Sequence, residues 1–349
     1  MPPDWLPTET IRKSLRALSR EETAVLAEYT DPLGLAGLRQ MIARRQGEKG
    51  VTVSPDQIVL TESGTQAIDL VCRLVLEAGD TVLVDDPCYF NFQALLRAHR
   101  AQIVSVPFTP EGPDVAAFEA MLRAHRPSLY ITNCGIHNPT GAVVSPVVAH
   151  KVLTLAEAYR LTIVEDDIFA DFEHTPAPRL ASFDGFERVI AIGSFSKTLS
   201  AAARCGFIAA KPDWIERLVD LKIATAFGGG RISEHLVLAV LGDAGYRKHV
   251  GGLRAHLERA RGKVGAQLEA MGIVPWTVPR AGMFLWAHLP KGCDGAHLAR
   301  VALEDELVLA PGNVFSPSQS AGAMMRFNVS QMGGEVIARL ERALARVGR

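Results

Sequence analysis

A lysine between a serine and a threonine is the best-placed reactive side chain in this sequence of 349 residues. Lys197 follows an apolar, mostly β-branched run, residues 189–192, that predicts a buried strand, so its side chain should emerge where that strand ends. A lysine that lies beside a packed, poorly solvated sheet has a lowered amine pKa, because burial disfavours the charged form. Lys197 is therefore a candidate nucleophile for a Schiff base with a carbonyl compound.

Groups that can bind an anion are predicted close to this lysine. Ser194 and Ser196 precede it and Arg204 follows it, so hydroxyl and guanidinium donors could hold a phosphate. A second phosphate contact is expected where a turn at residues 62–66 opens a helix, because the first helical turn presents unpaired N–H groups and the positive end of the dipole. The residues of this turn that matter are Ser63, Gly64 and Thr65.

Two further polar motifs complete a cofactor site. An apolar run at residues 161–164 is followed by acids, which could place Asp166 or Asp167 against a protonated pyridine nitrogen. Register favours Asp166, and the alternative is that both acids cap a helix. Asn138, in a rigid turn before Pro139, could donate a hydrogen bond into the same cleft. A lysine, a phosphate cradle and a carboxylate together predict pyridoxal 5'-phosphate (PLP) as the cofactor.

The order and spacing of these motifs resemble the class I/II aminotransferases of PLP fold type I, and in particular the aminotransferase-like domain of the GntR/MocR group. The resemblance runs from the segment 29–34 to the segment 325–328, nearly the whole chain. It implies an enzyme that moves an amino group between an L-amino acid and a 2-oxo acid, and a homodimer with shared active sites.

The resemblance also implies a role for each matching residue. Lys197 would carry the cofactor as an internal aldimine and move the substrate's α-proton. Asp166 would pair with the pyridine nitrogen, and Arg326 would bind the substrate α-carboxylate through both ends of its guanidinium. The remaining cofactor contacts would be Ser63, Gly64, Thr65, Ser194, Ser196 and Arg204 at the phosphate, Tyr89 stacked on the ring, Asn138 at the phenolic oxygen, and Tyr29 reaching across from the partner subunit.

One position departs from the family pattern. Phe169 stands where the family usually has a tyrosine, three residues after Asp166, that hydrogen-bonds the phenolic oxygen and keeps the pKa of the Schiff-base nitrogen low. Phenylalanine cannot donate, so only Asn138 remains for that oxygen. We expect a raised pKa of the Schiff base, and the alternative reaction classes are a lyase, a decarboxylase or an oxidase.

Strand-like and helix-like segments alternate along the chain, which predicts an α/β fold with a mostly parallel seven-stranded sheet flanked by helices and a smaller α+β domain. We assign residues 30–255 to a large PLP-binding domain, and residues 1–29 and 256–349 to a small domain. The predicted strands lie near residues 58–60, 82–84, 103–106, 129–132, 163–165, 189–192 and 206–209, a helix near 147–159, and further strands near 274–279 and 283–286.

Composition agrees with a globular enzyme. The chain has 37 basic and 38 acidic side chains and a net charge of −1, so no general attraction to nucleic acid or to an anionic membrane is expected. The five cysteines are scattered without a CxxC pair, which predicts reduced thiols and a cytoplasmic location. No metal site is expected, and no apolar run is long enough for a membrane span.

Other functions are weighed against this one. GntR/MocR regulators carry a DNA-binding winged helix before this domain, so an effector-sensing domain is an alternative; with fewer than thirty residues before Tyr29 we expect no winged helix here. The match of residues 194–197 to S-x-x-K lacks the partner motifs of serine acyl-transfer enzymes.

Two further segments carry basic side chains. The segment 246–271 is predicted to be a solvated helix, and Arg231, after a glycine loop, is a candidate contact for a substrate side chain.

Overall fold

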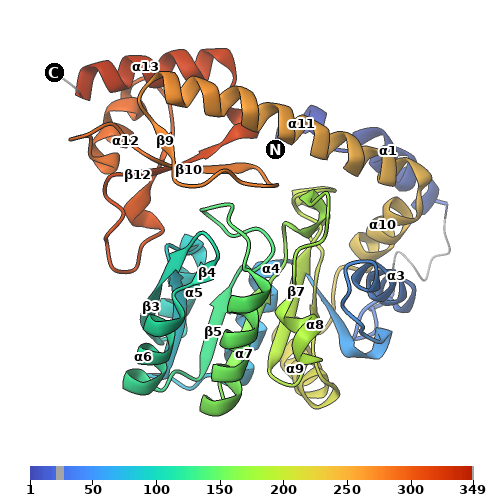
Figure 1. The fold of residues 1–349 in the computed structure, drawn as a ribbon. Helices are drawn as coiled ribbons and strands as arrows, with labels where there is room; N and C mark the ends of the chain where they lie inside the picture. The colour runs from blue at the N-terminus through green and yellow to red at the C-terminus, as the bar shows by residue number, and fades with distance from the viewer. Residues whose placement is uncertain (21–26, 348–349) are drawn as a thin grey trace.

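In the computed structural model, which describes residues 1–20 and 27–347, a large sheet and a smaller sheet are joined by one long helix (Figure 1). The large sheet has the strand order β1-β8-β7-β6-β5-β2-β3-β4. Its strands are β1 (Ile58–Thr61), β2 (Thr81–Asp86), β3 (Gln102–Thr109), β4 (Gly112–Pro113), β5 (Leu129–Thr132), β6 (Thr162–Asp166), β7 (Val189–Ser194) and β8 (Gly206–Ala209).

The five strands from β3 to β7 in this order are parallel, whereas β8 runs antiparallel to both of its neighbours, β1 and β7. All seven predicted strands are present, so the α/β prediction is confirmed. The eighth strand is the two-residue β4, which folds back on the end of β3 through the turn at Thr109 and Gly112. A two-residue strand leaves no apolar pattern in the sequence, because it spans only a single period of alternation.

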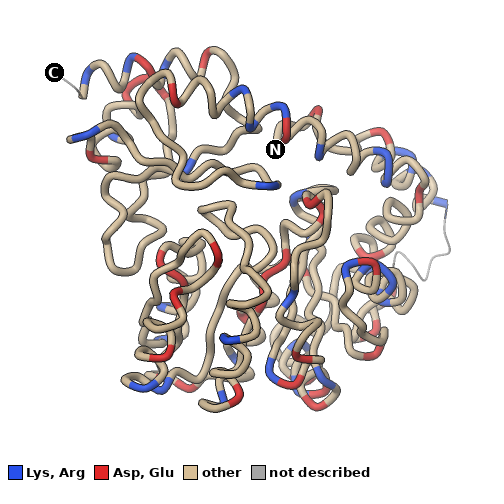
Figure 2. Tube along the Cα trace, viewed as in Figure 1, with Lys and Arg blue, Asp and Glu red and all other residues tan. Residues whose placement is uncertain are grey.

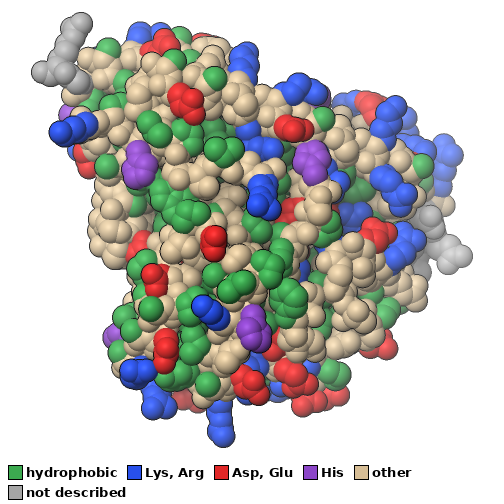
Figure 3. Space-filling view, in the orientation of Figure 1, with side chains coloured by type: hydrophobic (Ala, Val, Ile, Leu, Met, Phe, Trp, Pro, Cys, Tyr) green, Lys and Arg blue, Asp and Glu red, His purple; other side chains and the backbone are tan. Residues whose placement is uncertain are grey.

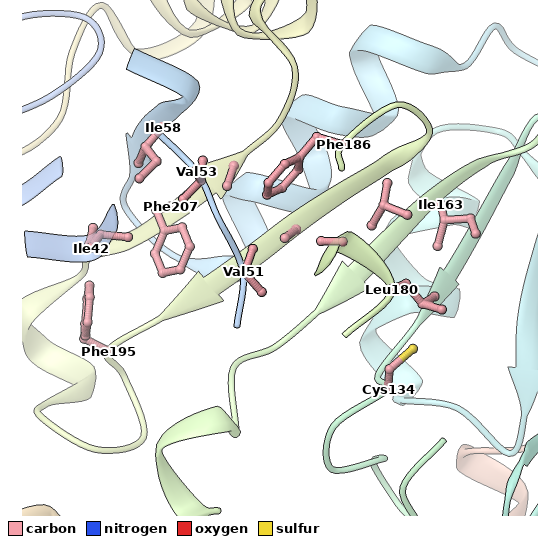
Figure 4. Close-up of a cluster of buried hydrophobic side chains, with 14 of the residues drawn as sticks. Ile42, Val51, Val53, Ile58, Cys134, Ile163, Leu180, Phe186, Phe195 and Phe207 are labelled. Carbon is pink, nitrogen blue, oxygen red and sulfur yellow. The ribbon is translucent and has the colours of Figure 1, made fainter. Parts of the chain in front are cut away.

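Helices cover both faces of the large sheet because its strands are apolar on both sides. Along β1, Ile58 and Leu60 belong to one buried cluster and Val59 to another, as alternation requires. Figure 4 shows part of the first cluster, in which Phe195 and Phe207 lie near Ile42. The helices around this sheet are α3 (Ala36–Gly47), α4 (Gly64–Val75), α5 (Phe90–Ala98), α6 (Val115–His125), α7 (Pro146–Tyr159), α8 (Leu180–Asp184), α9 (Pro212–Ala226) and α10 (Arg231–Gly242).

The smaller sheet is antiparallel and lies above the carboxyl ends of the parallel strands (Figure 1). Its order is β11-β12-β10-β9. The strand predicted at residues 274–279 is shorter than expected: β9 ends at Pro275, since the segment from Trp276 to Pro279 turns away. The elements of this part are β9 (Val274–Pro275), β10 (Phe284–His288), β11 (Ala310–Pro311), β12 (Met324–Asn328), α12 (Gly295–Glu304) and α13 (Gly334–Val347).

A 27-residue helix, α11 (Ala244–Ala270), connects the two parts, where the sequence predicts a long helix. Its buried side chains join the core of the large sheet as far as Val250 and the core of the small sheet from Leu253 onward. This change of core supports our proposed domain boundary at residues 255 and 256, which stays a prediction. Helix α1 (Thr8–Leu18) packs against α10. Charges of both signs are interspersed along the chain (Figure 2).

Several loops, including loops near the site, contain short 3₁₀ helices. They are η1 (Pro3–Trp5), η2 (Pro55–Gln57), η3 (Ala170–Phe172), η4 (Ala201–Ala203), η5 (Gly312–Val314) and η6 (Val329–Gln331). Among the residues that the structure describes, no helix is long and apolar enough to cross a membrane. All five cysteines are free, and four of them are buried.

Candidate active site

Lys197 lies in the loop that follows β7, half-buried at the carboxyl end of the large sheet. The pKa of its amine is lowered, first by burial and then by the positive charge of Arg326, while Asp166 acts in the opposite direction. Phe195 is buried in the core beside Phe207, with 6.2 Å between ring centroids, and holds the start of this loop. The backbone next to Lys197 is therefore held in place by the core, and the lysine amine lies near two charged groups, Arg326 and Asp166.

The next residue, Thr198, anchors the lysine loop to α11. Its hydroxyl accepts a hydrogen bond from Tyr246 at 3.0 Å and donates to Asp171 at 3.4 Å, and its carbonyl accepts from His249 at 3.0 Å. No pattern in the sequence marks these contacts, since Tyr246 lies 48 residues from Thr198 along the chain. The contacts give the lysine loop fixed support on the side facing α11.

Asp166 and Asp167, at the end of β6, have different surroundings. Asp167 forms an ion pair with the buried Arg179 at 2.9 Å. Asp166 is 7% exposed and accepts a hydrogen bond from the backbone N–H of Ile168 at 3.1 Å. Burial raises the pKa of Asp166 to about 7, and Lys197 is the nearby cation that lowers it. A buried carboxylate without an ion-pair partner is what a protonated pyridine nitrogen requires.

The residues predicted to hold a phosphate lie where α4 begins beside the end of β7. Ser63 is the N-cap of α4, and its hydroxyl accepts from the N–H of Gln66 at 3.1 Å, which leaves the first N–H groups of the helix available. A Cβ placed on Gly64 would lie 3.8 Å from the Cβ of Ser194. The hydroxyls of Ser194 and Ser196 are 3.0 Å apart.

A glycine in β8 allows this close approach. A Cβ on Gly206 would lie 2.8 Å from the carbonyl carbon of Ser63 and 3.0 Å from the nitrogen of Gly64, so only glycine fits without a shift. Thr65 is the second residue of α4. Arg204 is exposed in the left-handed conformation, with φ +43°, and forms no hydrogen bond or ion pair with a described residue. Backbone donors, hydroxyls and this arginine fit a phosphate group.

Arg326, on β12, brings the small sheet into the site. Its guanidinium lies 4.2 Å from the ring centre of Phe284 and 4.6 Å from that of Phe315, and donates to the side-chain oxygen of Asn138 at 2.9 Å. Its Nε has no partner among the described residues. Burial lowers its pKa to about 10. A buried guanidinium between two rings, without a carboxylate partner, is suited to bind the carboxylate of a ligand.

Tyr89 lies between these groups at the start of α5. Its ring packs edge-on against Phe92 at 5.4 Å. Burial raises the pKa of its hydroxyl, and the two nearby charges that act on it are Asp166 and Arg326. The backbone N–H of Cys88 donates to the carbonyl of Phe315 at 2.8 Å, which ties this loop to the small sheet. The structure therefore brings Lys197, Asp166, Asn138, Tyr89 and Arg326 together around one site.

Phe169, 5% exposed, turns toward the small part of the molecule. Its ring lies 5.6 Å from Phe284 and 6.0 Å from Phe172. Phe284 in turn lies under Arg326, so Phe169 supports the side chain of Arg326 through one intervening ring. It offers no hydrogen-bond donor to a cofactor.

Tyr29 and Arg231 lie beside each other and not with the cleft residues. Arg231 donates to the backbone carbonyl of Tyr29 at 2.9 Å and pairs with Glu28 at 3.6 Å. The side chain of Tyr29 is 78% exposed and contacts Phe227 at 4.8 Å. Neither residue contacts Lys197 or Arg326 within the described chain.

The chemistry of these donors matches one cofactor. The buried carboxylate of Asp166, the hydroxyl and backbone donors at the start of α4, which Gly206 allows to lie close to β8, and the amine of Lys197 with its lowered pKa fit the ring nitrogen, the phosphate and the aldehyde of PLP. Within residues 1–20 and 27–347, no group of three His, Cys, Asp or Glu side chains could hold a metal ion. The fold and the site define a PLP-dependent enzyme of fold type I.

Comparison with known proteins places the chain in a family. The chain belongs to the family Aminotransferase class I and II, which it matches over residues 4–344, and it is a PLP-dependent aminotransferase. It is 30% identical to 2-aminoadipate transaminase of Thermus thermophilus, over 99% of this chain and 87% of that protein. It is also 30% identical to the uncharacterized HTH-type transcriptional regulator YdcR of Escherichia coli, over 99% of this chain and 74% of that protein.

Solved structures agree with the sequence relatives. The α-aminoadipate aminotransferase LysN of Thermus thermophilus, complexed with N-(5'-phosphopyridoxyl)-L-leucine, superposes with a TM-score of 0.90 at 28% identity, covering 99% of this chain and 90% of that one. The kynurenine aminotransferase of Pyrococcus horikoshii superposes with a TM-score of 0.90 at 25% identity, covering 99% and 88%. The predicted cofactor and enzyme class are thereby confirmed.

Proposed function

We propose that Lys197, Asp166 and Arg326 form the centre of the aminotransferase site, and that the donor is an L-amino acid with an aromatic or large apolar side chain. One observation carries the proposal: Arg326 lies between Phe284 and Phe315 with no carboxylate of its own, while its charge acts on Lys197. The guanidinium would hold the α-carboxylate and the rings would contact the side chain.

The residues would divide the work as follows. PLP, when bound, supplies the electron sink that stabilises negative charge at the substrate's α-carbon. Asp166, ionised beside a pyridine N–H, keeps that nitrogen protonated. Lys197 takes the α-proton, since its lowered pKa favours the neutral amine. Arg326 orients the α-carboxylate, and Asn138, held by Arg326, offers its amide N–H to the cofactor's phenolic oxygen.

The remaining predicted contacts would hold the cofactor in place. Gly64 and Thr65 would donate backbone N–H groups to the phosphate, Ser194 and Ser196 their hydroxyls, and Arg204 its guanidinium. Tyr89 would stack on the ring. Ser63 would keep the first turn of α4 in position through its bond to Gln66. Each of these assignments follows from the donor type and its place at the cleft.

We infer that two copies of the chain share their sites. An exposed apolar patch supports this, because single-chain proteins rarely expose such a group of large side chains. The patch consists of Tyr29, Ile223, Phe227 and Ile232. Tyr29 would reach the phosphate of the partner subunit, and Arg231, which holds its carbonyl, would set its direction and is a candidate contact for a substrate side chain. The five free cysteines support a cytoplasmic location.

A panel of amino acids tests the proposal. The PLP-loaded enzyme is mixed with phenylalanine, tyrosine, leucine, 2-aminoadipate or glutamate, with a 2-oxo acid present, and the cofactor's absorption and the amino acid product are followed. Faster turnover with the aromatic and large apolar donors supports the proposal. Turnover confined to the two acidic donors would contradict the assignment of the side-chain pocket, and would favour the activity in the name of the Thermus thermophilus relative.

Two other outcomes of this experiment would favour the alternative functions, and each alternative rests on one observation. Release of ammonia without transfer would favour a lyase or an oxidase, for which the motive is Phe169 in place of a donor. A change of absorption without any product would favour an effector-sensing domain, for which the motive is the similarity to YdcR.

A further inference from the structure

A second cavity lies outside the cleft, between α3, η3 and the start of α11. Its volume is about 860 Å³. Small-molecule sites in proteins usually measure roughly 300 to 1,000 Å³. None of the residues that we assign to the cofactor or the substrate lines this cavity. We call it the α3–α11 cavity.

The floor of the α3–α11 cavity has more positive than negative charge. Asp171 receives the guanidinium of Arg45 on both carboxylate oxygens at 2.9 Å and the amine of Lys49 at 3.2 Å. Arg254 donates to the backbone carbonyl of Asp171 at 2.8 Å. One carboxylate therefore faces three cations, and the excess charge is partly buried.

The other acids of the cavity do little to balance this excess. Asp243 is paired with Lys13 at 2.8 Å, and Glu173 with Arg179 at 2.8 Å. Glu48 is exposed on the rim. Asp243 and Glu173 are thus each paired with another cation, and Glu48 is solvated. The remaining acids of the cavity therefore do not neutralise the positive charge of its floor.

Two arginines on the rim face the cavity from different helices. Arg44 on α3 and Arg247 on α11 are exposed, and neither forms an ion pair with a carboxylate in the described part of the chain. Figure 2 marks Lys and Arg positions along α3 and α11, and the space-filling view of Figure 3 shows basic side chains on the same side of the molecule. The start of α11 also lines the cavity at Ala244, where the helix dipole is positive.

We propose that the α3–α11 cavity binds a small molecule with at least two negative charges, either a phosphate ester or a dicarboxylate, independently of the reaction site. Guanidinium groups from two helices can hold such an anion at both ends, since the planar fork of arginine matches carboxylate and phosphate oxygens. Arg44 and Arg247 would bind the ligand directly, and the cations around Asp171 would supply the attractive field.

Isothermal titration of the PLP-loaded enzyme tests this, with inorganic pyrophosphate and citrate as probes at constant ionic strength. PLP saturation keeps the phosphate cradle filled. We expect saturable binding of one or both probes, one per subunit, and at least a tenfold loss of affinity in the double variant Arg44→Glu, Arg247→Glu, because both charged contacts to the ligand are lost and replaced by repulsion. Stronger binding of pyrophosphate identifies a phosphate ligand, and stronger binding of citrate a carboxylate.

Two controls separate this site from its alternatives. Lys248→Glu changes the same charge on the same helix, at a residue that lines a different cavity, and should keep its affinity within about twofold. Arg326→Ala should bind the probes as the wild type does. The proposal is overturned if neither probe saturates the wild type, if Lys248→Glu weakens binding as much as the double variant, or if Arg326→Ala alone abolishes it. Circular dichroism checks that each variant is folded.

Discussion

At the scale of single residues, the two aspartates at the end of β6 differ by their neighbours. Asp167 has a partner within the chain, Arg179 at 2.9 Å, whereas Asp166 has none of comparable strength. Burial raises the pKa of Asp166 to about 7 even with Lys197 nearby, so the carboxylate would be partly protonated at neutral pH. A positively charged ring nitrogen would keep it ionised, which links this residue to the cofactor by electrostatics.

Replacing Phe169 tests the missing donor. Phe169→Tyr should add a hydrogen bond to the cofactor's phenolic oxygen and lower the midpoint of the pH titration of the cofactor's absorption by about one pH unit, which corresponds to about 1.4 kcal/mol. The spectrum is recorded from pH 5 to 10. An unchanged midpoint would show that residue 169 does not reach this oxygen. Phe172→Tyr, at the neighbouring buried ring, is the matched control.

Replacing Arg326 tests the carboxylate site. Arg326→Ala should raise the KM for the amino donor about a hundredfold, since a charged hydrogen-bonded contact contributes up to about 3 kcal/mol. Steady-state kinetics with saturating PLP measure it. Arg300→Ala, at an exposed arginine of α12, should leave the KM unchanged. A normal KM in Arg326→Ala would mean that the α-carboxylate binds elsewhere.

At the scale of elements, the phosphate cradle depends on how closely β8 approaches α4. Gly206→Ala places a methyl group 2.8 to 3.0 Å from backbone atoms of Ser63 and Gly64, which must then shift. We expect the affinity for PLP to fall at least tenfold, because positions that define a site tolerate shifts of only about 0.5 Å. Equilibrium dialysis of the apoenzyme measures it.

A glycine with free space serves as the control for that change. Gly262→Ala lies within α11 with nothing within 4 Å of the added methyl. It should leave the affinity for PLP unchanged and raise the free energy of unfolding by about 0.5 to 1 kcal/mol, as alanine favours helix. Equal PLP affinity of Gly206→Ala and the wild type would show that Gly206 does not determine the geometry of the phosphate cradle.

Asp171 joins four elements through Arg45, Thr198 and Arg254. Although its burial alone would raise the pKa of its carboxyl, Lys49 and Arg45 hold that pKa well below its ordinary value. The ion pairs therefore stabilise the fold at all pH values above the ordinary pKa, about 4, and this stabilisation is lost as the pH falls toward the pKa of the folded state.

Removal of this charge should destabilise the protein. Asp171→Asn should lower the free energy of unfolding by about 3 kcal/mol at pH 7, because it leaves buried cations without their partner. The difference from the wild type should shrink below about pH 4. Urea unfolding at both pH values measures it. Asp56→Asn, at a carboxylate that is mostly exposed, should cost less than about 1 kcal/mol.

At the scale of the whole molecule, the sequence predicted most of the architecture because it rests on local patterns. Seven strands and the helix α7, with Ser145 as its N-cap, are readable from alternation and capping. The residues proposed for the cofactor site could be singled out in the sequence because they follow strands whose carboxyl ends meet at one edge. Resemblance to the family added Arg326, which no local pattern identifies.

The rest depends on contacts between distant segments. Phe284 and Phe315 enclose Arg326 from two different segments of the small part, and Asp171 meets Arg45 across 126 residues. Neither set has a spacing that marks it, since side chains that meet only in the folded state leave no period in the sequence. The strand at Val274 ended early for a similar reason: Pro279 packs against Gly141 of the large part.

Mixing two inactive variants tests the shared sites. Lys197→Ala should abolish activity, and Phe227→Ala together with Tyr29→Ala should weaken cofactor binding in the neighbouring site. Co-refolded mixtures should regain up to a quarter of the wild-type activity, since half of the dimers are mixed and one of their two sites is intact. Mixtures with no more activity than the separate variants would show that each chain completes its own site.

The most direct test of the account is the covalent attachment of PLP. Borohydride reduction of the PLP-loaded enzyme, followed by proteolysis and mass spectrometry, should add one phosphopyridoxyl group to the peptide that contains Lys197 and to no other peptide. The visible absorption of the enzyme should disappear in Lys197→Ala. An unmodified Lys197, or the same group attached to another lysine such as the buried Lys222, would contradict the proposed site.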